Sequence, residues 1–253
     1  MRKIGLAGCN GRMGRVITQM AAARDDMKIV AGFELVPNKL ADYPVYADVM
    51  EYQGEMDVLV DFSAASALDH HIAYCVERRI PILVAATGHS EEQLAALREA
   101  SSKIPVFKTA NLSLGVAVLD DLVRRATRLL GADFDIEVLE RHHNQKLDAP
   151  SGTAMSLARS IQEELPFEAE LVYDRHERRA KRPQKEIGMH AMRGGTIVGE
   201  HEVMYAGVNE TISISHSAQS REVFAAGALH AVKFLADREP GMYDMRALVA
   251  AVQ

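Results

Sequence analysis

The first 109 residues alternate short apolar segments with segments of helical periodicity, and this alternation constrains the fold more than any other feature. Apolar strands that alternate with helices predict a parallel sheet with helices packed on both of its faces. The expected strands are 3–7, 28–33, 56–62, 80–85 and 105–109, and the expected helices are 14–24, 66–78 and 90–101. We therefore expect an α/β domain in this part of the chain.

The second half of the chain has a different pattern. Helical periodicity over 114–130 precedes an alternating segment at 134–140, and a further helix follows Thr153. Later segments alternate with period two and are separated by glycine turns, which predicts antiparallel meanders. These expected strands are 187–192, 196–205 and 210–216, and helices are expected at 221–235 and 245–251. The pattern predicts an α+β domain over residues 113–221, with helices of 222–253 completing a first domain at 1–112.

A glycine-rich loop follows the first expected strand. Gly8, Gly11 and Gly14 have the spacing GxxGxxG, which is a weak signal alone, because a tight turn without a ligand can also use it. Glu34 follows the second strand, twenty positions after Gly14, where an acidic residue binds ribose hydroxyls of a dinucleotide. The context predicts a Rossmann-like domain that binds a dinucleotide, with contacts from Gly8, Cys9, Asn10, Gly11, Arg12, Met13 and Glu34.

Further contacts with the dinucleotide are expected where other strands of the parallel sheet end. Ligands bind at the carboxyl ends of the strands in such sheets. The candidate residues there are Ala85, Ala86, Thr87, Thr109, Ala110, Asn111 and Leu112. Leu35 follows Glu34 where an arginine would favour a 2′-phosphate, so NADH is favoured over NADPH, although Arg12 and Lys39 are nearby cations.

A second cluster of polar residues lies between 142 and 153. His142 and His143 would point to opposite sides of a continuing strand, which makes them poor ligands for one metal, so no metal is expected. Lys146 is a usable proton donor. Ser151, Gly152 and Thr153 begin a helix, whose N-terminus suits an anionic substrate. A charged loop with an ordinary helix cap is the alternative.

Composition excludes several classes of protein. The formal net charge of −6 argues against a nucleic-acid partner, whose binding site would be basic. No apolar segment approaches the roughly 20 residues that span a bilayer, so no membrane partner is expected. The N-terminus does not have the pattern of a signal peptide. Two cysteines, Cys9 and Cys75, provide no disulfide framework, and a cytoplasmic location is expected.

With these residues identified, the chain resembles the 4-hydroxy-tetrahydrodipicolinate reductases of bacterial lysine and diaminopimelate biosynthesis, formerly called dihydrodipicolinate reductases. The resemblance covers nearly the whole chain. It rests on the segments 8–15 and 142–154, with further matches at 193–195, 199–201, 220–221 and 224–225. It implies a dinucleotide domain and a mixed-sheet domain that forms the interface of a homotetramer.

The resemblance also implies an activity and roles for single residues. The enzyme would transfer a hydride from a nicotinamide cofactor to a small dicarboxylate substrate. His142 would act as acid and base and Lys146 as the proton donor, while His143, Ser151, Gly152 and Thr153 would hold the substrate.

The chain departs from the family pattern in three places. Residues 85–88 read Ala-Ala-Thr-Gly where Gly-Thr-Thr-Gly is common, Leu112 replaces a frequent phenylalanine, and Leu35 replaces a basic residue. The last departure supports a preference for NADH. Two other functions remain open: an oxidoreductase of the same fold that acts on another small dicarboxylate, and a non-catalytic NAD-sensing protein.

Overall fold

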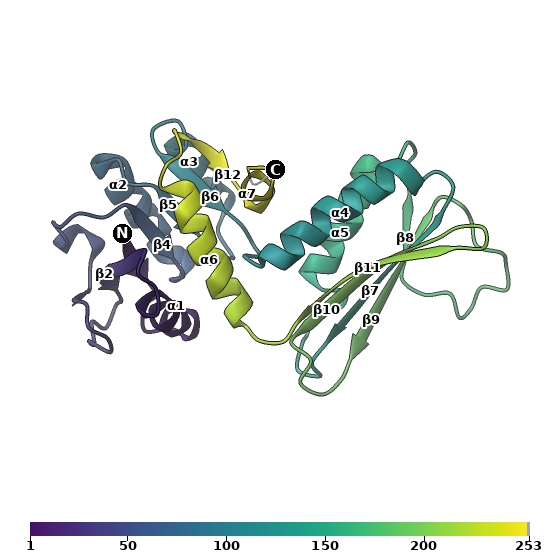
Figure 1. Ribbon diagram of the computed structural model, residues 1–253, viewed down its shortest axis with the longest axis horizontal. Coiled ribbons are helices and arrows are strands. Elements are labelled where there is room, and N and C mark those ends of the chain that lie inside the picture. The colour runs from purple at the N-terminus through teal and green to yellow at the C-terminus, as the bar shows by residue number, and fades with distance from the viewer. Residues whose placement is uncertain (252–253) are drawn as a thin grey trace. The chain divides into compact units, whose positions relative to one another are not determined.

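The computed structural model describes residues 1–251, and its contacts divide the chain into two units (Figure 1). The first unit combines Met1–Leu114 with the chain from Glu222 onward, and the second comprises Gly115–Arg221. The C-terminal segment therefore returns to the unit in which the chain begins.

The first unit is built on a seven-stranded sheet in the order β12-β6-β5-β4-β1-β2-β3, and every strand pair in it is parallel. Its strands are β1 (Arg2–Ala7), β2 (Met27–Phe33), β3 (Val45–Tyr46), β4 (Val58–Asp61), β5 (Ile82–Val84), β6 (Pro105–Lys108) and β12 (Gly241–Tyr243). Its helices are α1 (Arg12–Ala22), α2 (Leu68–Arg78), α3 (Glu91–Ala100), α6 (Glu222–Leu235) and α7 (Met245–Ala250), with 3₁₀ turns at Val49–Glu51 and Ala65–Ala67. The predicted parallel α/β sheet is confirmed.

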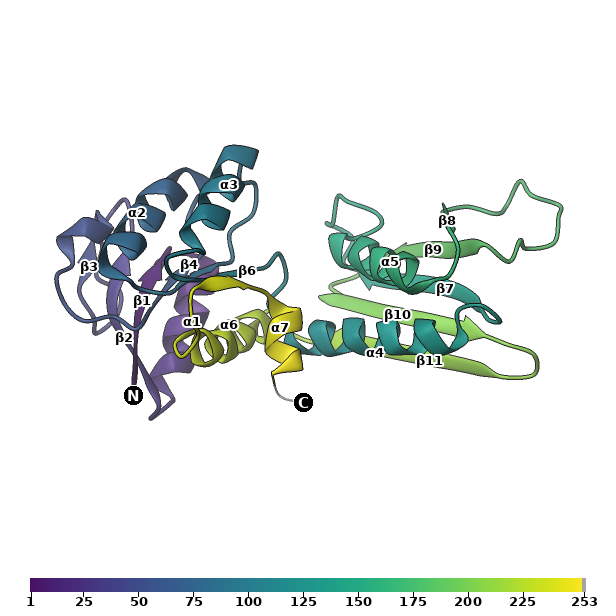
Figure 2. The ribbon, with the colours of Figure 1, turned by 90° about the horizontal axis from the view of Figure 1, so that it is seen from above.

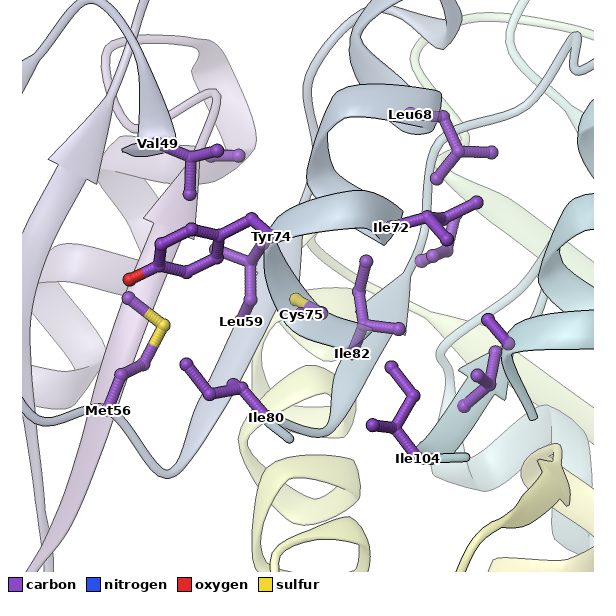
Figure 3. Packing of buried hydrophobic residues seen from close by; sticks show 14 of the residues in the cluster. Val49, Met56, Leu59, Leu68, Ile72, Tyr74, Cys75, Ile80, Ile82 and Ile104 are labelled. Carbon is purple, nitrogen blue, oxygen red and sulfur yellow. The ribbon is translucent and has the colours of Figure 1, made fainter. Parts of the chain in front are cut away.

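Helices cover both faces of this sheet, as its apolar strands require. Figure 2 shows α2 and α3 on one face and α1 and α6 on the other. On the α2 face, Leu59 and Ile82 of the sheet are fully buried together with Tyr74 and Cys75 of the helix (Figure 3). Burying side chains of this size stabilises the unit by roughly 1.5–3 kcal/mol each. The core thus stabilises the sheet beneath the loops at its edge.

The chain order of the sheet reverses beside β1. The strand that follows β1 in sequence, β2, lies on one side, whereas β4 lies on the other. A crevice forms at the carboxyl ends of the strands at such a point, because the two connections leave in opposite directions. The loops after β1, β2, β4, β5 and β6 all begin at this edge, since the strands are parallel.

The second unit contains a five-stranded mixed sheet in the order β11-β10-β7-β9-β8. Its elements are α4 (Leu114–Leu130), β7 (Asp135–His142), α5 (Gly152–Glu164), β8 (Glu170–Val172), β9 (Glu186–Arg193), β10 (Gly199–Ala206) and β11 (Thr211–Ala218). Both helices pack on one core with the sheet, through Leu119 and Val123 of α4 and Leu157 and Ile161 of α5.

The predicted antiparallel meander is correct for one strand pair and wrong for another. Strands β10 and β11 pair in antiparallel fashion. However, β9 and β10 do not pair, because β7 lies between them, parallel to β9 and antiparallel to β10. The turn after β9 explains this, since its hydrogen bonds are made to the end of β7: Gly194 N donates to His142 O (2.9 Å) and Asn144 N donates to Gly195 O (3.3 Å).

Element boundaries differ from the predictions mainly at short strands. The strands β3, β8 and β12 were not predicted, because two or three residues are too few to show a period. Strand β7 extends to His142 rather than ending at Glu140. That extension matters, because it places His142 on the same face of the sheet as Glu140.

Candidate functional site

The glycine loop after β1 takes a shape that only glycine permits at two positions. Gly8 has a φ of +77°, and a Cβ there would lie 2.7 Å from the carbonyl oxygen of Phe62. A Cβ on Gly14 would lie 2.6 Å from Cα of Cys9. The loop therefore packs more closely on the chain around it than a side chain at either position would permit.

Helix α1 begins directly after this loop. Gly11 is its N-cap residue, and no side chain within the described part of the chain caps it there. An uncapped helix N-terminus offers N–H groups and a positive partial charge to a phosphate. The first turn carries no acidic residue that would repel one. The residues present therefore fit a pyrophosphate.

Glu34 lies beside the loop, as the sequence predicts. Its Oε1 atom accepts a hydrogen bond from the backbone N–H of Asn10 at 2.9 Å, which ties the end of β2 to the loop. Leu35, Arg12 and Lys39 are all exposed, and Leu35 is 89% exposed. The side chain after the acidic residue is thus free to be exchanged without disturbing the core.

Cys9 faces the protein interior. Its side chain is buried against Gly32 and Tyr43, and burial raises the pKa of its thiol. A thiol in this setting is not a nucleophile. Only the backbone of Cys9 is placed to meet a ligand, whereas Met13 on α1 is half-buried.

The two loops after β5 and β6 are tied to each other and to their neighbours. Ala85 N donates to Asp61 O (3.0 Å), and Nζ of Lys108 donates to Ala86 O (2.6 Å). Asn111 N donates to Oγ1 of Thr109 (3.1 Å). Leu112 is buried, so its side chain packs inside the unit rather than at the surface of the loop. The sequence did not indicate that Lys108 would link these loops, because a lysine at the end of a strand is ordinarily solvated.

A buried aspartate and a buried histidine are paired where β4 ends. Asp61 ends β4, and its Oδ2 atom contacts Nδ1 of His71 at 2.8 Å while Oδ1 accepts from the backbone N–H of Ser63 at 2.8 Å. Burial alone would raise the pKa of Asp61, but the bonds from His71 and Ser63 outweigh it and the pKa lies below its ordinary value. The ionised carboxylate holds the loop after β4 in place.

In the second unit, the end of β7 presents the paired histidines. His142 is buried, and its Nδ1 donates to Oε2 of Glu140 at 2.6 Å. His143 is half-buried. A turn follows in which Lys146 N donates to His143 O (3.2 Å), and Nζ of Lys146 pairs with Oδ1 of Asp148 at 2.8 Å. The structure thus brings an oriented imidazole and an ammonium group to the same end of the strand.

Helix α5 begins at Gly152, within the predicted anion site. Ser151 is the N-cap residue, and its Oγ accepts from Ala154 N at 3.2 Å and contacts Nε2 of His201 at 2.9 Å. Because Ser151 is buried, its hydroxyl serves the helix cap rather than an open surface. Gly152 is exposed, and a Cβ on it would meet nothing within 4 Å. Thr153 is half-buried beside it.

Asp148 occupies the neighbourhood of this helix end. The pKa of its carboxyl is lowered, first by the hydrogen bond from Lys146 and also by the backbone N–H of Gly152. The Asp148 side chain is 58% exposed. A carboxylate of this chain therefore already makes the contacts that an anionic substrate would need.

Three residues of this region were not given roles by sequence reasoning: Glu140, Arg193 and His201. Glu140 is fully buried. Its carboxylate oxygens accept hydrogen bonds from both Nη atoms of Arg193, with N···O distances of 2.7 and 2.8 Å. The ring of His201 meets that of His142 edge to face, with centroids 5.2 Å apart. Burial is the main cause that lowers the pKa of His201 to about 4, and the electrostatic interaction with His142 is the second. The alternation along β7 could have indicated Glu140, since it shares a face with His142.

Residues 1–251 contain neither a cluster of metal ligands nor a helix that could span a membrane. No group of three or more histidine, cysteine, aspartate or glutamate residues in that range could hold a metal ion. None of the helices described there combines the length and the apolar character needed to cross a membrane.

Both units of the chain match models of one protein family. Residues 2–112 match the family described as "Dihydrodipicolinate reductase, N-terminus". Residues 115–249 match "Dihydrodipicolinate reductase, C-terminus".

The relatives agree. A 4-hydroxy-tetrahydrodipicolinate reductase of Caldanaerobacter subterraneus subsp. tengcongensis is 49% identical over 249 residues, which is 98% of each chain. One from Clostridium tetani is 45% identical and covers 98% of this chain and 97% of its own. A dipicolinate-bound dihydrodipicolinate reductase from Paenisporosarcina sp. TG-14 shares the fold, with a TM-score of 0.80 at 21% identity over 96% of this chain and 97% of that one. The chain belongs to the dihydrodipicolinate reductase family.

Proposed function

We propose that this chain reduces 4-hydroxy-tetrahydrodipicolinate to tetrahydrodipicolinate with NAD(P)H, in lysine and diaminopimelate biosynthesis. One observation supports the chemistry most directly. The imidazole of His142, which a carboxylate holds, and the ammonium group of Lys146 lie near the start of a helix. The first residue of that helix, Gly152, is exposed. This reduction adds a hydride and a proton to a ring with two carboxylates and releases the 4-hydroxyl group as water, so it needs a proton donor beside an anion site.

The first unit would hold the cofactor, which supplies the hydride. The loop Gly8 to Met13 and the N-terminus of α1 would bind its pyrophosphate, with Glu34 accepting hydrogen bonds from ribose hydroxyls. The loops after β5 and β6 would face the nicotinamide, mostly through backbone groups, since the side chain of Leu112 packs inward. The residues proposed for these loops are Ala85, Ala86, Thr87, Thr109, Ala110, Asn111 and Leu112.

The second unit would hold the substrate and move the proton. Lys146 would donate the proton, and His142 would act as acid and base beside it. His143, Gly152 and Thr153 would bind the substrate carboxylates, while Ser151 would contribute by capping α5. A substrate carboxylate would displace Asp148 from Lys146 and from Gly152. The exposure of the Asp148 side chain would allow that exchange.

Three finer features of the function are also proposed. Leu35 offers no guanidinium to a 2′-phosphate, which favours NADH over NADPH. The second unit would form the interface of a homotetramer. Light scattering of the purified protein tests this, because it measures whether the particle in solution has the mass of four chains. The enzyme would work in the cytoplasm, where free buried cysteines such as Cys9 and Cys75 stay reduced.

The proposal is tested by an absorbance assay. NADH and NADPH oxidation are followed at 340 nm after addition of the freshly prepared condensation product of pyruvate and aspartate semialdehyde. We expect rapid oxidation that depends on this product, with the higher kcat/KM for NADH. Oxidation no faster than without enzyme would reject the reductase. Faster oxidation with a different small dicarboxylate would favour an oxidoreductase of the same fold with another substrate.

A further inference from the structure

A single buried carboxylate connects three segments of the proposed substrate region. Glu140 is 0% exposed, and each of its two carboxylate oxygens accepts two hydrogen bonds. Oε2 accepts from Nδ1 of His142 (2.6 Å) and Nη1 of Arg193 (2.8 Å). Oε1 accepts from Nη2 of Arg193 (2.7 Å) and from the backbone N–H of Ser151 (2.9 Å). Its partners therefore come from the end of β7, the end of β9 and the start of α5.

The surroundings keep this carboxylate ionised. Burial alone would raise the pKa of Glu140, but the hydrogen bonds from Arg193, His142 and Ser151 together hold it below its ordinary value. Removing a carboxylate from water costs several kcal/mol, and an apolar side chain of similar volume is often equally stable at such a place. The stability of the unit therefore gives little reason for a charged residue here.

The charge of Glu140 has a direct consequence for His142. An ionised carboxylate has no proton to donate, so Nδ1 of His142 must carry the hydrogen of their bond. The neutral imidazole is then confined to one tautomer, in which Nε2 has a free lone pair and can accept a proton. Nε2 faces the first residue of β10, Gly199, where an added Cβ would lie only 3.0 Å away. Glycine at that position leaves Nε2 uncrowded.

The same carboxylate also positions the helix N-terminus. By accepting from Ser151 N, Glu140 holds the N-cap residue of α5, and Gly152 and Thr153 follow directly in the chain. Arg193 reinforces this connection, because its Nη2 also donates to the carbonyl oxygen of Asp148 at 2.6 Å. One side chain thus fixes the distance between the imidazole and the start of α5.

We propose that Glu140, held by Arg193, is a positioning residue of the reductase that sets the His142 tautomer and aligns its ring with the anion site at α5. The inference rests on the proposed function for its effect on turnover. The tautomer itself is independent of substrate. A positioning residue of this kind contributes through the geometry of the group that it holds, and its loss lowers kcat more than it alters binding of the cofactor.

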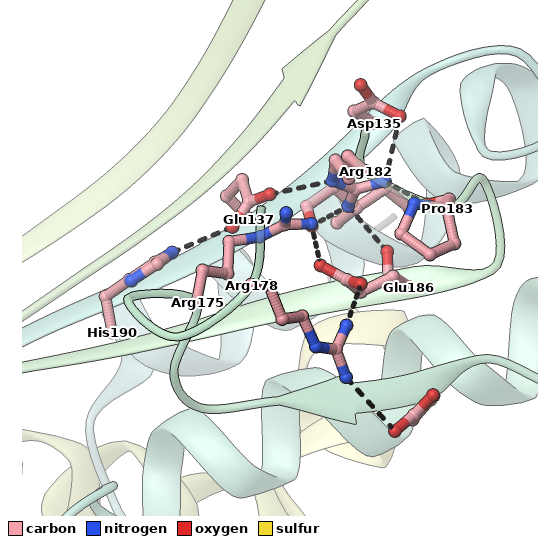
Figure 4. Close-up of polar contacts among 10 residues, drawn as sticks. Asp135, Glu137, Arg175, Arg178, Arg182, Pro183, Glu186 and His190 are labelled. Carbon is pink, nitrogen blue, oxygen red and sulfur yellow. Dashed lines mark hydrogen bonds and ion pairs between the residues drawn. The ribbon is translucent and has the colours of Figure 1, made fainter. Parts of the chain in front are cut away.

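The test compares Glu140→Gln with a matched control. Glu186 is also a buried glutamate of this sheet, 3% exposed, and it pairs with Arg175 and with Arg178 (Figure 4), the latter at 3.2 Å. Glu186→Gln therefore removes a buried charge bound by two arginines without touching His142. We expect Glu140→Gln to lower kcat about 100-fold with NADH affinity unchanged, and Glu186→Gln to retain the wild-type kcat.

The decisive readout is the ¹⁵N spectrum of the imidazole nitrogens above pH 8, without substrate. The wild type and Glu186→Gln should show His142 protonated on Nδ1 alone, whereas Glu140→Gln should show a mixture of tautomers. An unchanged tautomer in Glu140→Gln, or an equal loss of kcat in both variants, would overturn the inference. A wild type without reductase activity would reject the proposed function, while the spectra would still test Glu140.

A second variant covers the case in which Glu140→Gln does not fold. Glu140→Asp keeps the charge but is one methylene shorter, so it cannot reach all of its donors. We expect it to retain the Nδ1–H tautomer while kcat falls about tenfold. A wild-type kcat in Glu140→Asp would show that the length of this side chain does not position the ring, which contradicts the proposal.

Discussion

The two units of the molecule present their candidate sites in opposite ways. In the first unit the loop is mostly backbone, and its shape depends on side chains that are absent, at Gly8 and Gly14. In the second unit the region depends on charged or ionisable side chains, namely the buried Glu140 and His201 and the half-buried Arg193. Backbone groups suit a phosphate, which many proteins bind in the same way, whereas placing a proton requires particular side chains in a particular geometry.

Because of this difference, substitutions in the two units should affect different kinetic quantities. A backbone cradle loses affinity when it is altered, but the chemistry of the bound complex need not change. A side chain that transfers a proton should lose turnover instead, with cofactor affinity intact. The following variants test this division from the largest expected effect to the smallest.

Lys146→Ala should have the largest effect. If Lys146 is the proton donor, removing it should lower kcat by about 10³-fold, within the range for general acids. NADH affinity, measured by fluorescence titration, should stay at the wild-type value, because the change is confined to the second unit. Lys185→Ala serves as the control, since Lys185 is an exposed lysine of the same unit. Turnover within twofold of the wild type would remove Lys146 from the role.

Acid should weaken the second unit before the first. The pKa of His201 is about 4 in the folded chain, below the ordinary 6.5, so the unfolded state binds more protons between these values. The stabilisation is complete above pH 6.5 and is lost as the pH falls to 4, a change of about 3 kcal/mol. In the first unit, the lowered pKa of Asp61 causes a loss of stability only below its ordinary 3.8, and half-buried His89, whose pKa burial also lowers, causes a smaller loss below 6.5.

This difference can be measured by incubating the protein between pH 7 and 4 and pulse labelling its amides at one fixed pH. Mass spectrometry of peptides from each unit should show the second unit opening first. His201→Gln, which removes the titrating group, should reduce the dependence. Equal opening of both units through this range would contradict the assignment.

The sequence predicted the two sites unequally, and the reason lies in their construction. The residues Gly8, Gly14 and Glu34 follow consecutive strands, so local spacing and a parallel sheet were enough to bring them together. Glu140, Arg193 and His201 belong to three strands, β7, β9 and β10, and meet only because β7 is inserted between the other two. The predicted hairpin of β9 and β10 would have excluded Glu140. Local periodicity carries no information on such an insertion.

Glu34→Ala tests the first unit. Glu34 is proposed to bind the ribose and it also holds Asn10, so its removal should raise the Kd for NADH about tenfold, as expected for a lost hydrogen bond to a charged group. Saturating NADH should restore most of kcat. Glu77→Ala, which changes an exposed glutamate of α2, provides the control. A Kd unchanged from the wild type would reject the ribose role, and a kcat that saturating NADH does not restore would break the division between the units.

Thr153→Val should have the smallest effect and tests the anion site alone. Valine keeps the shape of threonine but lacks the hydroxyl, so one hydrogen bond to a substrate carboxylate would be lost at the start of α5. Because backbone N–H groups of the helix start would still hold the carboxylate, we expect a loss of only about 1 kcal/mol, which corresponds to a KM roughly fivefold higher. Thr153→Ser keeps the hydroxyl and should retain the wild-type KM. If both variants raise KM equally, the methyl group of Thr153 supports the helix end and the hydroxyl does not contact the substrate. If neither does, backbone N–H groups hold the carboxylate, and the second unit binds its anion in the same way as the first.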